Sequence, residues 1–109
     1  MKTELNVNNF DGRILKDTGT IVVLFEADWC PFCRQFASTF ELLRQSNVPS
    51  ARVDLGDLDN PLWDTFSIEI VPTVLIFKSG SIIQRYDGVS GRGLDAAIIP
   101  EIISIFKSR

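Results

Sequence analysis

Two stretches of the chain, residues 20–25 and 73–77, are apolar at almost every position and β-branched in part. A strand with one solvated face alternates apolar and polar residues, whereas a short continuous apolar run is typical of a strand buried on both faces. Lys78-Ser79-Gly80 turns the second run back into residues 81–86, which predicts an antiparallel hairpin. The sequence therefore predicts an α/β fold with a central mixed β-sheet and helices on both faces.

The remaining segments extend this pattern to the order β-α-β-α-β-α-β-β-α. The further elements are strands over residues 5–7, 51–55 and 81–86 and helices that begin at the cysteine pair, after Asn60 and near Ser90. An apolar stripe with helical spacing from Phe36 to Leu43 supports the first of these helices. Asparagine followed by proline, as at Asn60 and Pro61, is typical of an N-cap and the first helical position.

A helix is expected near each end of the chain. Phe10, Ile14 and Leu15 have the spacing of one helix face near the N-terminus. The last helix is expected to begin near Ser90 and to contain Pro100 in its interior. An interior proline removes a backbone hydrogen bond and kinks or ends a helix, so we expect a bend or break at this position.

The composition is that of a soluble domain. The chain has 109 residues, 45% of them apolar and 23% charged, so we expect a single domain over residues 1–109. A net charge of −3 argues against nucleic acid or an anionic membrane as a partner. Neither a signal peptide nor a membrane span is recognisable, which favours a cytoplasmic location. The protein is also expected to be a monomer.

Two cysteines, Cys30 and Cys33, and the absence of histidine limit the chemistry. A structural zinc site needs about four cysteine or histidine ligands, so no metal is expected. A disulfide closing so short a loop would contribute only about 1.9 kcal/mol to stability, and a cytoplasmic compartment would tend to reduce it. Redox chemistry is the better interpretation of this pair.

The position of the pair suits that chemistry. A thiol attacks a disulfide as a thiolate, and Cys30 is expected at a strand–helix junction, where the free N–H groups of the helix stabilise negative charge. Pro31 suits the first helical turn, and Cys33 follows one turn later, close enough to attack a mixed disulfide formed by Cys30. Trp29 and Phe32 flank the sulfur with apolar surface that is expected to hold a substrate chain.

These residues resemble a known family. The segment Ala27-Asp28-Trp29-Cys30-x-x-Cys33, followed about 40 residues later by Ile70-Val71-Pro72-Thr73, is similar to the thioredoxin family. The match includes Phe77-Lys78-Ser79-Gly80 and the turn glycine Gly88. The resemblance implies a thioredoxin fold and a thiol–disulfide oxidoreductase in which Cys30 is the nucleophile and Cys33 the resolving cysteine.

The resemblance also implies a substrate site and partners. The Val71–Pro72 bond is expected to be cis and to pack against the cysteines, with Val71 offering its backbone to the substrate. Gly88 matches a glycine that lets the substrate approach closely. Disulfide-containing proteins are the expected substrates, and a separate reductase is the expected electron donor. No cofactor is expected, because the glycines form no phosphate-binding loop.

Three departures from the family pattern leave alternatives open. Thioredoxins usually have Gly-Pro between the cysteines, whereas Pro31-Phe32 resembles the Pro-Tyr of glutaredoxins, so a glutathione-linked reductase is an alternative. The Pro-His of oxidising enzymes keeps an oxidase or isomerase open as well, since potentials in this group span about −270 to −120 mV. Leu24 stands where thioredoxins carry a buried acid, and Pro100 interrupts the last helix.

A binding module that senses redox state is a further alternative. The apolar residues at the C-terminal end would suit docking to a partner, although helix packing explains them equally: Ile102, Ile103, Ile105 and Phe106.

Glu26 is the candidate substitute for the missing acid. Side chains alternate along a strand, so Glu26 is expected on the same face as Leu24 and one step nearer the cysteines. It could accept the proton of Cys33 directly or through water, and partial burial would raise its pKa. Arg52, near the position of a family lysine, would lower that pKa, and the sequence leaves the sum of the two effects undecided.

Overall fold

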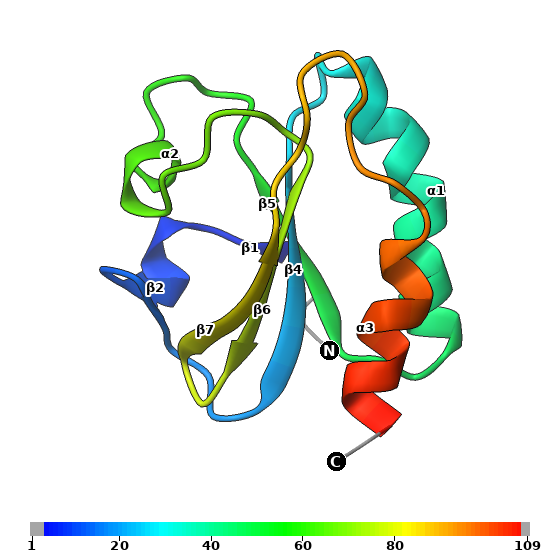
Figure 1. Ribbon diagram of the computed structural model, residues 1–109. Helices are drawn as coiled ribbons and strands as arrows, with labels where there is room; N and C mark the ends of the chain where they lie inside the picture. Colours follow the sequence, from blue (N-terminus) through cyan, green and yellow to red (C-terminus); the bar gives the residue numbers. More distant parts are fainter. Residues whose placement is uncertain (1–3, 108–109) are drawn as a thin grey trace.

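A five-stranded mixed sheet forms the centre of the protein, seen in the computed structural model, which describes residues 4–107 (Figure 1). Its strands are β1 (Glu4–Leu5), β4 (Thr20–Glu26), β5 (Ser50–Asp54), β6 (Thr73–Lys78) and β7 (Ser81–Tyr86). The order across the sheet is β1-β5-β4-β6-β7. β1, β5 and β4 run parallel, whereas β6 and β7 pair antiparallel, so the prediction of a mixed sheet is confirmed.

The side chains of β4 alternate between two apolar layers. Val22 and Leu24 pack in the layer formed with α1 (Pro31–Gln45) and α3 (Ile98–Lys107), which lie side by side on one face of the sheet (Figure 1). The side chains of the other parity point into the layer on the opposite face, below α2 (Leu62–Thr65). Helices therefore cover both faces, as the two apolar runs predict.

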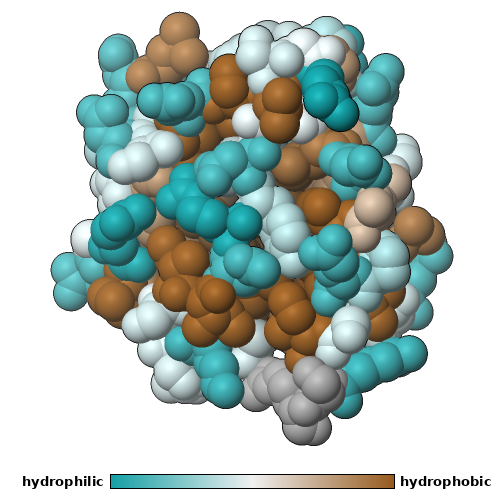
Figure 2. Space-filling model, viewed as in Figure 1, coloured by the Kyte–Doolittle hydropathy of each residue, from teal (hydrophilic) through white to brown (hydrophobic). Residues whose placement is uncertain are grey.

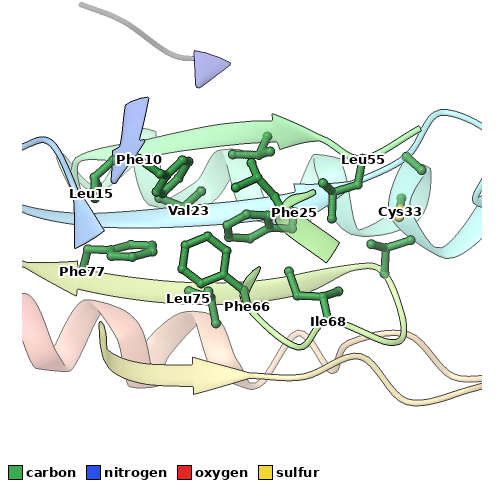
Figure 3. Packing of buried hydrophobic residues seen from close by; sticks show 14 of the residues in the cluster. Phe10, Leu15, Val23, Phe25, Cys33, Leu55, Phe66, Ile68, Leu75 and Phe77 are labelled. Atoms are coloured by element: carbon green, nitrogen blue, oxygen red, sulfur yellow. The ribbon is translucent and has the colours of Figure 1, made fainter. Parts of the chain in front are cut away.

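Four phenylalanines fill the layer on the α2 side of the sheet: Phe10, Phe25, Phe66 and Phe77. Their rings meet edge-on or tilted, with centroids 5.2 Å apart for Phe10 and Phe66 and 5.8 Å apart for Phe66 and Phe77. Figure 3 shows this cluster running along the sheet toward Cys33, which lies at its end beyond Leu55. The cysteine pair is thus continuous with the core.

The helix expected near the N-terminus is wrong. Residues 7–9 form a 3-10 turn, and a small hairpin of β2 (Phe10–Asp11) and β3 (Ile14–Leu15) follows. Gly12 supplies the left-handed turn at φ 57°, and the side chains of Asn6 and Asn9 cap the preceding turn. Phe10 and Leu15 are buried whereas Ile14 is half exposed, so the three apolar residues do not share one face.

The last helix also differs from the expectation. It begins at Ile98 rather than near Ser90, because Gly91 and Gly93 adopt positive φ and the Asp95 carboxylate accepts a hydrogen bond from the Ala97 N–H. Pro100 therefore lies in the first turn of α3, where its missing N–H has no helical partner to lose. The predicted kink at Pro100 is wrong: the proline stands at the start of the helix rather than in its interior.

Candidate active site

Cys30 occupies the N-cap of α1. Its backbone is extended, at φ −102° and ψ 112°, and its sulfur accepts a hydrogen bond of 3.2 Å from the backbone N–H of Cys33. Pro31 follows at the first helical position, where its missing N–H costs nothing. A free helical N–H thus points at the sulfur, as the sequence predicts, and favours negative charge on it.

Cys33 lies one turn inside the helix and is the more deeply buried of the pair. It is 1% exposed against 6% for Cys30, and both are free thiols. Burial raises the pKa of the Cys33 thiol to about 12, and its hydrogen bond with Cys30 acts in the same direction. A hydrogen bond with the Ala27 backbone lowers the pKa in part. Cys33 is therefore the less accessible of two largely buried sulfurs.

The loop before β6 covers the cysteines. The Val71–Pro72 bond is cis, as the resemblance implies, and the Val71 carbonyl accepts a hydrogen bond of 3.5 Å from the Cys30 thiol. Thr73 stabilises this loop, because its hydroxyl donates a hydrogen bond to the Ile70 carbonyl and accepts one from the Gly88 N–H. Thr73 belongs to the motif of residues 70–73, but the sequence alone indicates no role for its hydroxyl.

Gly88 lies against this loop from the other side. A Cβ built at Gly88 would collide with the Pro72 carbonyl and lie 3.1 Å from Cγ2 of Ile70. The backbone of the protein itself therefore requires glycine here, since a side chain would displace the Pro72 loop. Glycine at this position keeps the Pro72 carbonyl in place, which is a different reason from the expected approach of substrate.

Trp29 and Phe32 border the cysteines in different ways. Trp29 is half exposed, and its indole N–H donates to the Gly56 carbonyl at 2.9 Å, which ties it to the loop after β5. Phe32 is partly buried, because the loop before α3 lies on it: a Cβ at Gly93 would come within 2.9 Å of the Phe32 Cβ. In the sequence, Gly91 and Gly93 fall within the segment expected to form the last helix, so no signal indicated that they belong to a loop that packs on Phe32.

Glu26 ends β4 on the same side as Cys33. Its carboxylate lies 3.3 Å from Nε of Arg52 on β5, and both side chains are partly exposed. Burial raises the pKa of Glu26 and outweighs Arg52, which lowers it; Asp54 and Glu4 raise it further. The sequence left undecided whether burial or Arg52 has the larger effect on the Glu26 pKa; burial does, and the net change is a rise.

Comparison with known proteins agrees with this geometry. The sequence profile described as Thioredoxin matches residues 1–99. Thioredoxin H4 of Arabidopsis thaliana is 33% identical over 82 residues, which are 72% of this chain and 68% of that protein. The chain belongs to the thioredoxin family. The mitochondrial thioredoxin of Mus musculus is 27% identical over 107 residues, 93% of this chain but 64% of that protein.

Longer relatives and solved structures complete the comparison. Protein disulfide-isomerase of Triticum aestivum is 36% identical over 92 residues, which span 77% of this chain and only 18% of that protein. The crystal structure of thioredoxin f from spinach chloroplast (short form) superposes with a TM-score of 0.76 at 22% identity, covering 96% of this chain and 92% of the other. The fold is therefore the thioredoxin fold, as predicted.

Family and site together define the chemistry. A thioredoxin-family chain with free thiols at Cys30 and Cys33 is a thiol–disulfide oxidoreductase that acts on protein disulfides. Among residues 4–107, no three potential metal-binding side chains gather as a metal site would require. No helix within those residues is long and apolar enough to cross a membrane.

The structure brings most of the predicted site residues together at one end of the sheet. Figure 1 shows the loop before α1 beside the loop that follows β7, and Figure 2 shows apolar groups separated by hydrophilic ones over the same end. Pro31 is exposed next to Trp29, whereas the side chain of Val71 is buried. The residues that the sequence analysis missed are Gly56, Thr73 and Gly93, each of which holds a predicted residue in place.

Proposed function

We propose that the protein is a general protein-disulfide reductase that a separate reductase keeps in its dithiol form. The observation that carries the proposal is the N-cap geometry of Cys30, whose sulfur faces the free N–H of Cys33 and the carbonyl of Val71. This is the arrangement of an attacking thiolate with its resolving partner one turn away. The reductase direction is supported by likeness to thioredoxins over most of the chain.

The proposed reaction has two exchanges. The Cys30 thiolate attacks one sulfur of a substrate disulfide, and a Cys30–substrate disulfide forms while the second substrate sulfur leaves as a thiolate with the electron pair. Cys33 then loses its proton and attacks the Cys30 sulfur, which forms the Cys30–Cys33 disulfide and releases the other substrate sulfur. Two electrons pass from the protein dithiol to the substrate, and the released thiolates take up protons from water.

The substrate is proposed to lie across Trp29, Pro31 and the Val71–Pro72 loop. Within residues 4–107 the Val71 N–H makes no hydrogen bond, so it can pair with the backbone of a substrate chain. The exposed ring of Trp29 supplies apolar contact beside the sulfur. Phe32 and Gly88 support this surface from beneath, Phe32 against the loop before α3 and Gly88 against Pro72.

The proposal includes a monomer in a reducing compartment, the cytoplasm being the expected one, with disulfide-containing proteins as partners. The reducing compartment follows from the proposed activity, since an electron donor must return a reductase to its dithiol form after each turnover.

The experiment is to measure the reduction potential of the Cys30–Cys33 couple and to identify its reductant. We expect a potential near the reducing end of the range, about −270 mV, and reduction by a flavin-dependent thioredoxin reductase with NADPH. Efficient reduction by glutathione alone would favour the glutathione-linked alternative. A potential near about −120 mV would favour an oxidase. Failure to turn over any protein disulfide, with intact thiols, would leave the redox-sensing binding module.

A further inference from the structure

The resolving thiol is placed where its proton is hard to remove. Cys33 is almost completely buried, and burial is the largest of the effects that raise its pKa to about 12. The contributions of Cys30 end once its sulfur is held in a mixed disulfide, but the burial of Cys33 remains. A thiol attacks only as a thiolate. The second exchange of the proposed function therefore needs a base that can reach this sulfur.

One cavity, of about 280 Å³, reaches Cys33 from the side of α1 and β5. The charged residues that line it are Glu4, Glu26, Asp28, Arg34, Arg52 and Asp54. Since a water molecule occupies about 30 Å³ of liquid, the cavity has room for several, and its polar lining supplies partners for them. A proton can thus pass between the Cys33 sulfur and a carboxylate in this cavity without crossing the apolar core.

Glu26 is the carboxylate best placed to receive it. It immediately precedes Ala27, whose backbone makes a hydrogen bond with the Cys33 sulfur. Of the carboxylates in the described part of the chain, Glu26 is the one whose charge acts on Cys33. Asp54 is engaged by the Gly56 N–H, and Asp28 and Glu4 are exposed.

We propose that the Glu26 carboxylate takes the proton of the Cys33 thiol, directly or through water in this cavity, as Cys33 attacks the mixed disulfide. The inference rests on the proposed function for its reaction. Leu24, the previous residue on this face of β4, is fully buried and apolar and cannot take part.

Arg52 acts as a positioning residue for this carboxylate. Its Nε lies 3.3 Å from Oε2 of Glu26, and its charge lowers the Glu26 pKa against burial and against the charges of Asp54 and Glu4. A general base works best when its pKa lies near the working pH. Burial, Asp54 and Glu4 raise the pKa of Glu26 in that direction, while Arg52 limits the rise.

The step balances as follows. The S–H bond of Cys33 breaks, and its proton joins a Glu26 oxygen while the electron pair stays on sulfur. That pair forms the Cys33–Cys30 bond, the Cys30–substrate bond breaks, and the substrate sulfur leaves with its electron pair. The proton on Glu26 then passes to water, and the substrate thiolate takes a proton from water.

The test follows the second exchange alone, with a small aromatic disulfide whose thiolate is coloured. Attack by Cys30 releases one equivalent of colour, and resolution by Cys33 releases the second. In the unaltered protein the resolution rate should rise with pH through the Glu26 pKa and then level off. In Glu26→Gln it should be about 100-fold lower near neutral pH and rise tenfold per pH unit without levelling.

Whether the resolution rate falls or rises in Glu26→Gln distinguishes a proton acceptor from a carboxylate that affects Cys33 only through its charge. The charge of Glu26 raises the Cys33 pKa, so removing that charge without removing a base would make resolution faster. An equal or faster resolution rate in Glu26→Gln would therefore overturn the proposal. Glu101→Gln on α3 removes the same charge away from the cysteines and should leave both phases unchanged.

Three further variants keep the carboxylate and serve if Glu26→Gln fails to fold. Glu26→Asp should retain a level region in its pH profile. Arg52→Met should move the bend of the profile to higher pH, and Asp54→Asn should move it to lower pH, because Arg52 lowers and Asp54 raises the Glu26 pKa. If the pH at which the rate levels off is the same in Arg52→Met and Asp54→Asn as in the unaltered protein, the assignment to Glu26 is contradicted. Absence of the first phase in every protein would instead contradict the proposed function.

Discussion

Cys30 and Cys33 are the same residue type three positions apart, but the fold surrounds them differently. The Cys30 sulfur lies at the helix end, between the N–H of Cys33 and the Val71 carbonyl. The Cys33 sulfur lies inside α1 against the core, and burial raises its pKa to about 12. The comparison shows that one sulfur faces the free N–H groups of a helix end while the other is enclosed by the core, so we expect Cys30 to attack first and Cys33 to react second.

Removing the sulfur at the helix end should have the largest effect. We expect Cys30→Ser to lower protein-disulfide reduction to the uncatalysed level, because a serine hydroxyl forms no thiolate and cannot attack a disulfide. Turnover of a disulfide-containing protein with an excess of reductant measures it. Catalysis above background by this variant would show that Cys33 attacks by itself.

Removing the buried sulfur should stop turnover but spare the first exchange. We expect Cys33→Ser to accumulate a mixed disulfide at Cys30 that persists for want of a resolving thiol. Mass spectrometry of each single variant after exposure to substrate measures the trapped species. Equal trapping by Cys30→Ser and Cys33→Ser would remove the difference between the two positions.

Moving the Pro72 loop should slow the attack by Cys30 and leave Cys33 buried. In Gly88→Ala the new Cβ meets the Pro72 carbonyl, so the loop must move. A shift of this kind commonly costs about 10-fold to 100-fold in rate and about 1–3 kcal/mol in stability. The rate of attack by Cys30 and the free energy of unfolding are the measurements.

Gly19→Ala is the matched control, because a Cβ there meets only an ordinary contact at 3.5 Å. If both alanine variants behave alike, the close approach of Gly88 to Pro72 has no role in placing the site.

Loosening Trp29 should have the smallest effect. Trp29→Phe keeps an aromatic ring but loses the N–H that donates to Gly56, for which we expect about 1 kcal/mol of lost stability and a few-fold higher KM. Trp63→Phe is the matched control, since Trp63 donates to the Asp57 carbonyl of the same loop. A similar rise in KM in both variants would assign the effect to the loop rather than to contact with Trp29.

Features set by local sequence could be predicted. The N-cap position of Cys30 follows from a buried strand that ends at Glu26 and from a proline suited to the first helical position at Pro31, and the sheet follows from two apolar runs. The cis bond at Pro72 was predicted from the family resemblance and not from the residues themselves.

Features set by long-range packing could not. The start of α3 depends on two glycines at positive φ and on an Asp95 cap, which compete with a helical pattern that looks continuous in sequence. The contact of Gly93 with Phe32 joins loops far apart in the chain. For Glu26, the sequence predicts that burial raises its pKa and that Arg52 lowers it, and only the three-dimensional burial shows which effect is larger.

The unequal state of the two thiols can be measured directly by alkylating the reduced protein over a range of pH and locating the label by fragmentation of the labelled peptide. The account predicts that label enters at Cys30 first near neutral pH. At Cys33 the rate should stay low and rise tenfold per pH unit without levelling below about pH 12, because only its thiolate reacts. Labelling of Cys33 as fast as Cys30, or a Cys33 rate that levels off near an ordinary thiol pKa, would contradict it.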